Sequence, residues 1–180
     1  MADAVREWPW GRRLGWGDMP APGLEIQMRA QGDELAAIAQ AVGVEAVRSA
    51  AADLSLRRWL DGVELTGRLR AVLARTCGVS LDPLDETIEE NLSLRLVPAG
   101  SSSAARDAAG EVLVSLDEPD PPEEIEGASI DLADLLTQQI ALCMSPFPRK
   151  PGAVFTAPTH GTDDSPFAAL ASLKARREDP

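Results

Sequence analysis

Three side chains in this sequence are of the kind that attack substrates or carry protons. The chain holds one histidine, His160, and two cysteines, Cys77 and Cys143. A catalytic dyad or triad needs a base held rigidly beside its nucleophile. His160 lies in a stretch of Pro, Thr, Gly and Asp, which is not expected to hold its side chain in a fixed position. Both cysteines fall on apolar positions of an expected strand and helix, so we expect small core residues rather than nucleophiles.

A run of carboxylates offers a second kind of chemistry. Five acids crowd into the nine residues from Asp82 to Glu90, namely Asp82, Asp85, Glu86, Glu89 and Glu90. Oxygens gathered in this way can hold magnesium for phosphodiester hydrolysis. No GxxxxGK, GxGxxG or HExxH motif accompanies them. A carboxylate- and metal-dependent RNA-processing enzyme is therefore the alternative hypothesis, and our main expectation is a protein without catalytic residue, metal or cofactor.

The net charge of −12 is concentrated in the middle of the chain. From Asp82 to Asp134 there are fifteen acids and two bases, whereas the rest of the chain holds fourteen acids and fifteen bases. A surface of this sign repels phosphate and attracts a basic partner, such as a ribosomal protein. The competing interpretation is a solvated, solubilising surface. Residues 117–126 hold six acids and three prolines and predict an exposed loop. Its candidate partner contacts are Glu123, Glu124 and Glu126.

Cations that could touch an rRNA precursor stand mainly near the ends of the chain. They include the pairs Arg12-Arg13, Arg149-Lys150 and Arg176-Arg177. Strand alternation also places Arg68 and Arg70 on one solvent face, which Arg57, Arg58 and Arg75 would extend if all five line up. No RRM-type or KH-type motif accompanies these cations. An ordinary solvated face is the competing interpretation.

Tryptophans and arginines alternate near the N-terminus. Trp8, Trp10 and Trp16 lie among Arg12, Arg13 and several prolines and glycines. Such a segment can stack on bases or in a protein groove. Its rings can equally lie over the edge of the domain core, and the sequence leaves both possibilities open.

Length and composition set the class of protein. A chain of 180 residues suits one domain with tails. No run of about 18 apolar residues predicts a membrane span, and Pro, Gly and charge interrupt any signal-like stretch at the N-terminus. The two cysteines lack metal-ligand spacing and fit a reducing compartment. We therefore expect a cytoplasmic protein.

Hydrophobic periodicity predicts alternating sheet and helix. Residues 24–28, 52–57, 63–73, 88–96 and 112–116 show period two or apolar runs typical of strands, and Asp61-Gly62 supplies a hairpin turn. Residues 33–42 form an amphipathic pattern ended by Gly43. A second helix is expected to begin after the capping residue Asp131 and to end at Ser145-Pro146.

These elements predict an α+β fold, with an antiparallel, curled sheet, one or two packed helices and flexible tails. We expect an arm over 1–20, one domain over 21–147, and a Pro-rich tail over 148–180. The tail ends in a short amphipathic helix, which either packs on the domain or docks in a groove of a partner. Its candidate contact residues are Phe167, Leu170, Leu173 and Lys174.

Three stretches resemble the YceD family. Residues 165–174 (SPFAALASLK) are similar to its terminal signature, residues 130–149 to its late helix and Pro-rich exit in alphaproteobacterial members, and residues 76–83 (TCGVSLDP) to its central cysteine strand and turn. With the order of elements, the resemblance covers most of residues 22–175.

The resemblance implies a role in accumulation of large-subunit (23S) ribosomal RNA in bacteria and plastids. The family's genes commonly neighbour a gene for a large-subunit ribosomal protein, and no family-wide enzymatic mechanism carries over. Many relatives have Arg-Cys-Leu or a second cysteine where Cys77 stands alone. That departure puts metal binding at this position in doubt.

Overall fold

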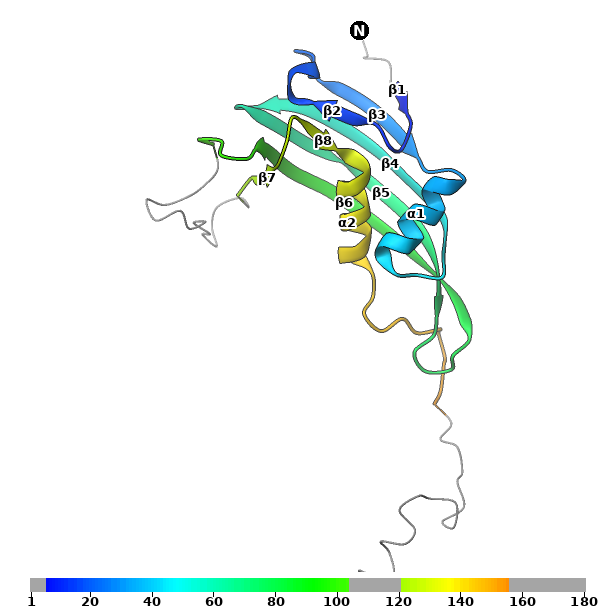
Figure 1. The fold of residues 1–180 in the computed structure, drawn as a ribbon. Helices are drawn as coiled ribbons and strands as arrows, with labels where there is room; N and C mark the ends of the chain where they lie inside the picture. The colour runs from blue at the N-terminus through cyan, green and yellow to red at the C-terminus, as the bar shows by residue number, and fades with distance from the viewer. Residues whose placement is uncertain (1–5, 104–120, 156–180) are drawn as a thin grey trace, which may run out of the picture.

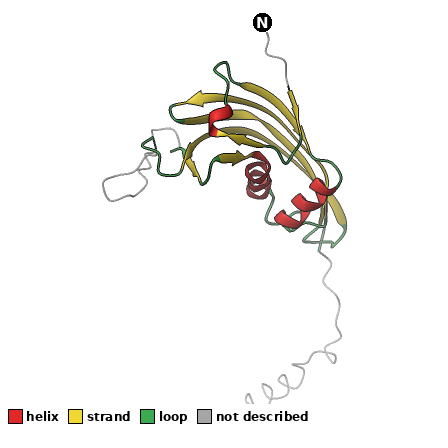
Figure 2. Cartoon of the chain, turned by 45° about the horizontal axis from the view of Figure 1, so that its top comes forward, coloured by secondary structure: helices red, strands yellow, loops and turns green. Residues whose placement is uncertain are grey.

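The computed structural model describes residues 6–103 and 121–155. Its centre is a six-stranded sheet in the order β1-β3-β4-β5-β6-β7. The sheet is curled and open, and both helices lie against one of its faces (Figures 1 and 2). The expected α+β class, curled sheet and two packed helices are therefore confirmed.

Four long or central strands form an antiparallel meander: β3 (Leu24–Arg29), β4 (Ala46–Trp59), β5 (Gly62–Thr76) and β6 (Pro83–Pro98). The two outermost strands, β1 (Arg6–Trp8) and β7 (Glu123–Ile125), pair parallel with β3 and β6. The sheet is thus antiparallel except at its edges, where the sequence did not predict parallel pairing.

Period two along β5 sets the buried face, as expected. Its apolar odd-numbered residues are at most 2% exposed, and they are Val63, Leu65, Leu69, Ala71 and Leu73. Gly67 interrupts this series, opposite Leu54 of β4 and Leu92 of β6. A Cβ atom at Gly67 would lie 2.2 Å from the carbonyl oxygen of Asp53, so the two strands approach too closely there for any side chain.

Two helices cover the apolar face. Helix α1 (Asp33–Val42) ends at Gly43, whose φ of 71° is the left-handed conformation that glycine adopts freely. Helix α2 (Leu132–Cys143) begins at Asp131, whose side chain accepts a hydrogen bond from the backbone N–H of Asp134 at 3.1 Å. Both helix predictions are confirmed. The side chains of α2 that are at most 5% exposed are Leu132, Leu135, Leu136 and Ile140.

The segment expected as an N-terminal arm is part of the folded domain from Arg6 onward. Strand β1 pairs with β3, and β2 (Arg13–Gly15) pairs antiparallel with β8 (Ser129–Asp131) in a second, two-stranded sheet. A short 3₁₀ helix follows at Trp16–Asp18. Trp10 is 3% exposed, and Trp8 and Trp16 pack against the core. These three tryptophans therefore pack on the domain core, as one of the two interpretations of the segment expected.

Two further differences concern the acidic middle. The exposed loop expected over 117–126 includes strand β7, so Glu123 and Glu124 belong to a sheet edge. The strand expected at 112–116, His160 and the terminal segment 167–174 lie outside the described residues. Within the described parts of the chain, no helix is long and apolar enough to cross a membrane.

Candidate functional site

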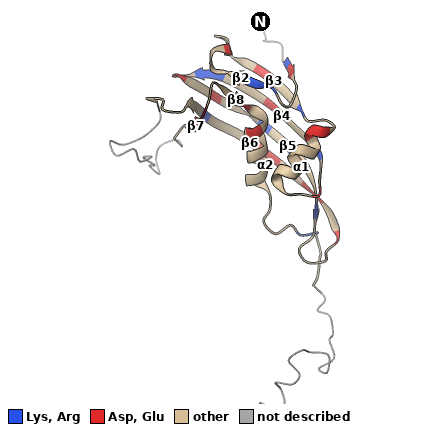
Figure 3. Ribbon diagram, viewed as in Figure 1, with Lys and Arg blue, Asp and Glu red and all other residues tan. Residues whose placement is uncertain are grey.

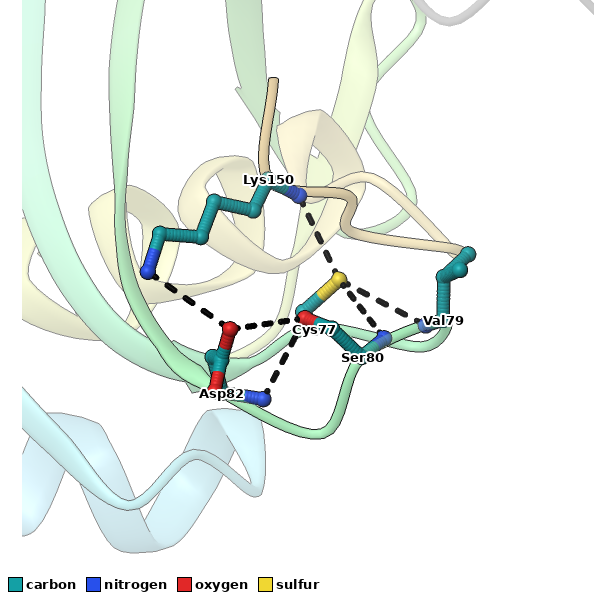
Figure 4. Close-up of polar contacts among 5 residues, drawn as sticks. All are labelled: Cys77, Val79, Ser80, Asp82 and Lys150. Atoms are coloured by element: carbon teal, nitrogen blue, oxygen red, sulfur yellow. Dashed lines mark hydrogen bonds and ion pairs between the residues drawn. The ribbon is translucent and has the colours of Figure 1, made fainter. Parts of the chain in front are cut away.

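Cys77 lies at the end of β5, where its thiol holds two distant segments together. Its Sγ accepts hydrogen bonds from the backbone N–H groups of Val79, Ser80 and Lys150, each at 3.4 Å (Figure 4). The Lys150 side chain extends to Asp82, with Nζ and Oδ2 3.7 Å apart. The expected core position of Cys77 is confirmed, since its side chain is 0% exposed.

The three N–H groups stabilise a negative charge on the sulfur. The hydrogen bonds, led by that from Lys150, lower the pKa of Cys77 to about 6 against the opposing effect of burial. The three N–H groups come from two segments far apart in the sequence, the turn after β5 and the chain that follows α2. This arrangement therefore anchors the segment after α2 to the turn after β5.

Stability should rise with pH because of this thiol. An unfolded cysteine titrates near pKa ~8.5, so between about pH 6 and 8.5 the folded chain has released a proton that the unfolded chain retains. We expect the free energy of unfolding to increase across this window and to level off above it. In Cys77→Ser that increase should largely disappear, as measured by urea unfolding at pH 6, 7 and 8.5.

Cys143→Ser is the matched control for this titration. Cys143 is half-buried on α2, and burial together with Glu90 raises the pKa of its thiol, so it cannot produce a rise in stability over the same range. The control should keep the rise. The chain has one histidine, so few other side chains titrate there. An unchanged pH profile in Cys77→Ser would contradict the thiolate assignment.

The carboxylates of Asp82–Glu90 do not gather at one point. Asp85 pairs with Arg48 at 2.8 Å, and Glu86 pairs with Arg75 at 2.5 Å, while Asp82 faces Lys150. Strand geometry sends neighbouring side chains to opposite faces of β6. No group of three or more metal-ligating side chains occurs within residues 6–103 and 121–155. The described chain thus gives the metal-dependent alternative no assembled site.

The cations of the sheet are interspersed with acids. Arg68 and Arg70 share the solvent face, as alternation predicts, but Arg70 pairs with Asp53 at 3.3 Å and Arg68 bonds Asn91 at 3.4 Å. Arg57 lies on the same face, opposite Glu64, but Arg58 bonds the carbonyl of Met19 and Arg75 turns to Glu86, so the five arginines do not all line up. Both signs recur along the strands in Figure 3. This face offers no continuous track for phosphates.

An acidic groove lies where β7, β8, β2 and the start of α2 meet. It has a volume of about 650 Å³. All three acids predicted as partner contacts line it, and Asp131 and Asp134 join them from the helix start. The one cation in its lining, Arg13, is paired with Asp131 at 3.0 Å. The eleven lining residues are Arg13, Glu123, Glu124, Ile125, Glu126, Ser129, Ile130, Asp131, Asp134, Leu135 and Gln138.

The acids of the groove differ in how firmly they are held. Glu124 accepts a hydrogen bond from the backbone N–H of Gly100 at 3.0 Å, and Asp131 caps α2. Glu123 and Glu126 are exposed. The sequence indicated the three glutamates by charge alone, but it could not place Arg13, 118 residues away from Asp131, in the same groove.

Other predicted contacts are dispersed. Arg149 is exposed, whereas Lys150 is committed to the Cys77 turn through its backbone and to Asp82 through its side chain. The predicted contacts Phe167, Leu170, Leu173 and Lys174 lie outside the described residues.

Comparison with known proteins gives one match. The family model described as large ribosomal RNA subunit accumulation protein YceD matches residues 65–174, which is more than half of the 180-residue chain. The matched part includes the Cys77 turn, β6, the acidic groove apart from Arg13, and α2. No curated protein and no solved structure gave a match. The match over this length, together with the three resembling stretches, shows that the chain belongs to the YceD family.

Proposed function

We propose that this protein is a non-catalytic factor that supports accumulation of large-subunit ribosomal RNA by holding a basic segment of a large-subunit ribosomal protein. The family assignment supplies the role in rRNA accumulation. The observation that carries the binding mode is the groove with five acids and one already paired cation. A basic segment complements this charge, whereas a phosphate backbone would be repelled.

The dimensions and composition of the groove also suit a peptide. Ile125, Ile130 and Leu135 provide apolar area between the carboxylates, so the aliphatic stems of lysine or arginine side chains can pack there while their charges meet the acids. Large-subunit ribosomal proteins carry such segments because their partner RNA is polyanionic. Holding one before it reaches RNA would keep the protein available for assembly.

Neutralising Glu123 and Glu126 together tests this mode of binding. Glu123→Gln/Glu126→Gln should weaken capture of large-subunit ribosomal proteins about fivefold, because exposed ion pairs contribute about 0.5 kcal/mol each. The salt dependence of capture should also become shallower. Immobilised full-length protein is presented with proteins stripped from purified large subunits, and mass spectrometry identifies what it retains.

Glu45→Gln/Glu89→Gln is the matched control, since both acids are exposed and lie outside the groove. Equal losses in the two double variants would mean that net charge alone governs capture. If the unaltered protein retains no large-subunit protein in about 50 mM salt, where surface electrostatics are strong, the proposal fails. Glu124 is left intact because it bonds the backbone of Gly100.

A further inference from the structure

A second pocket of opposite character lies next to the acidic groove. Its volume is about 370 Å³, within the usual range for small-ligand sites of about 300–1,000 Å³. Arg13 lines both spaces, so strand β2 stands between them. The pocket is lined by Arg6, Trp8, Arg12, Arg13, Leu14, Asp18, Pro20 and Leu24.

Two of its arginines have unused donors. The guanidinium of Arg12 lies over the Trp8 ring, with 4.6 Å between Cζ and the ring centroid. Trp8 packs against the core, so it supports this cation from below. Neither the Arg6 nor the Arg12 guanidinium forms a hydrogen bond or ion pair with any described residue, unlike that of Arg13, which bonds Asp131. Both are exposed.

We infer that this pocket binds a short single-stranded segment of RNA. Arg6 and Arg12 would donate to a phosphate, for which the planar guanidinium is well suited. A base would stack on the Arg12 guanidinium that Trp8 supports, in the way that single-stranded RNA is held by aromatic and arginine planes. A simple anion would use only the guanidinium donors. The aromatic ring beside them favours a ligand that also carries a base.

The two neighbouring sites together fit a protein–RNA junction. This step rests on the proposed function, because the RNA bound here would be the one that meets the ribosomal protein in the groove. The acids beyond Arg13 repel phosphate, which restricts RNA to the side of Arg6 and Arg12. The pocket also precedes residue 65, where the family match begins, so it is a feature read from this chain itself.

A binding measurement with naked RNA tests the inference without any ribosomal protein. The probe is a fluorescein-labelled, ten-nucleotide single-stranded RNA of mixed sequence, and anisotropy reports its binding to the full-length protein at 50 and 200 mM salt. Two phosphate contacts on a single strand predict a salt slope of about −1.4, hence about sevenfold weaker binding at the higher salt. Arg6→Gln/Arg12→Gln should weaken binding about tenfold at 50 mM salt and flatten that slope.

Arg29→Gln/Arg48→Gln removes the same charge from exposed positions outside the pocket. This control should bind nearly as well as the unaltered protein. The inference is overturned if the two double variants lose equally, if the pocket variant binds normally, or if the unaltered protein does not bind the RNA at 50 mM salt. Capture of ribosomal proteins should persist in Arg6→Gln/Arg12→Gln, so failure of RNA binding is distinguishable from failure of the groove.

Discussion

Gly67→Ala is expected to destabilise the domain by about 3 kcal/mol or more, because overpacking that displaces backbone exceeds the usual cost of an extra methylene. The new Cβ would lie 2.2 Å from the Asp53 carbonyl oxygen and 2.9 Å from the Leu54 Cα atom. Neither atom belongs to a flexible side chain, so β4 and β5 must separate locally. Urea unfolding followed by tryptophan fluorescence measures the loss.

Gly11→Ala is the control for this substitution. A Cβ atom at Gly11 meets nothing within 4 Å, and its backbone is not left-handed, so the change should stay within about 0.5 kcal/mol of the natural protein. Comparable stability of the two alanine variants would contradict the close approach of β4 and β5 at Gly67.

Glu86→Ala is expected to cost about 2–4 kcal/mol of unfolding free energy, since it leaves the Arg75 guanidinium without its counter-charge in a largely buried position. The two side chains are 15% and 16% exposed. Glu86 also accepts a hydrogen bond from the backbone N–H of Ser145 at 2.7 Å, and Arg75 donates to the Ser145 carbonyl at 2.7 Å. The pair therefore fixes the chain leaving α2 onto β6, and thermal or urea unfolding should report its removal.

The neighbouring Asp85 provides the comparison. Its pair with Arg48 is about half exposed on both sides, so Asp85→Ala should cost under about 1 kcal/mol. A carboxylate acting in catalysis would instead lose activity in rRNA processing without a loss of stability. If Glu86→Ala remains as stable as Asp85→Ala and yet abolishes rRNA accumulation, the enzymatic alternative would gain support.

Local pattern was sufficient to predict the elements whose one face is buried. The alternation in β5 and the stripe of α2 each arise because a regular backbone repeats its exposure every two or 3.6 residues. The cap at Asp131 and the end of α1 at Gly43 follow from backbone donors and left-handed geometry, which are also local. These predictions needed no knowledge of what the elements pack against.

Pairings between distant, short segments could not be predicted in the same way. Strands β1, β2, β7 and β8 have three residues each, too few to show a period. Trp8 carried both a packing and a stacking interpretation, because the sequence does not show that β3 lies beside it. The groove was missed for the same reason: its charges were visible, but the β2–β8 pairing that brings Arg13 to Asp131 is a tertiary event.

Strand β6 is much longer than β7, its neighbour at the outer edge of the sheet, and this difference in length has a consequence for self-association. Within the described chain, β7 pairs only with Leu96, Val97 and Pro98, so most of the outer edge of β6 has no strand partner. Such an edge is a template on which another chain could add itself. Along it stand Pro83, which lacks a donor, and the exposed acids Glu89 and Glu90, whose charge repels a second copy of the same edge. Two of the carboxylates that first suggested a metal centre, Glu89 and Glu90, therefore act as gatekeepers against intermolecular sheet growth.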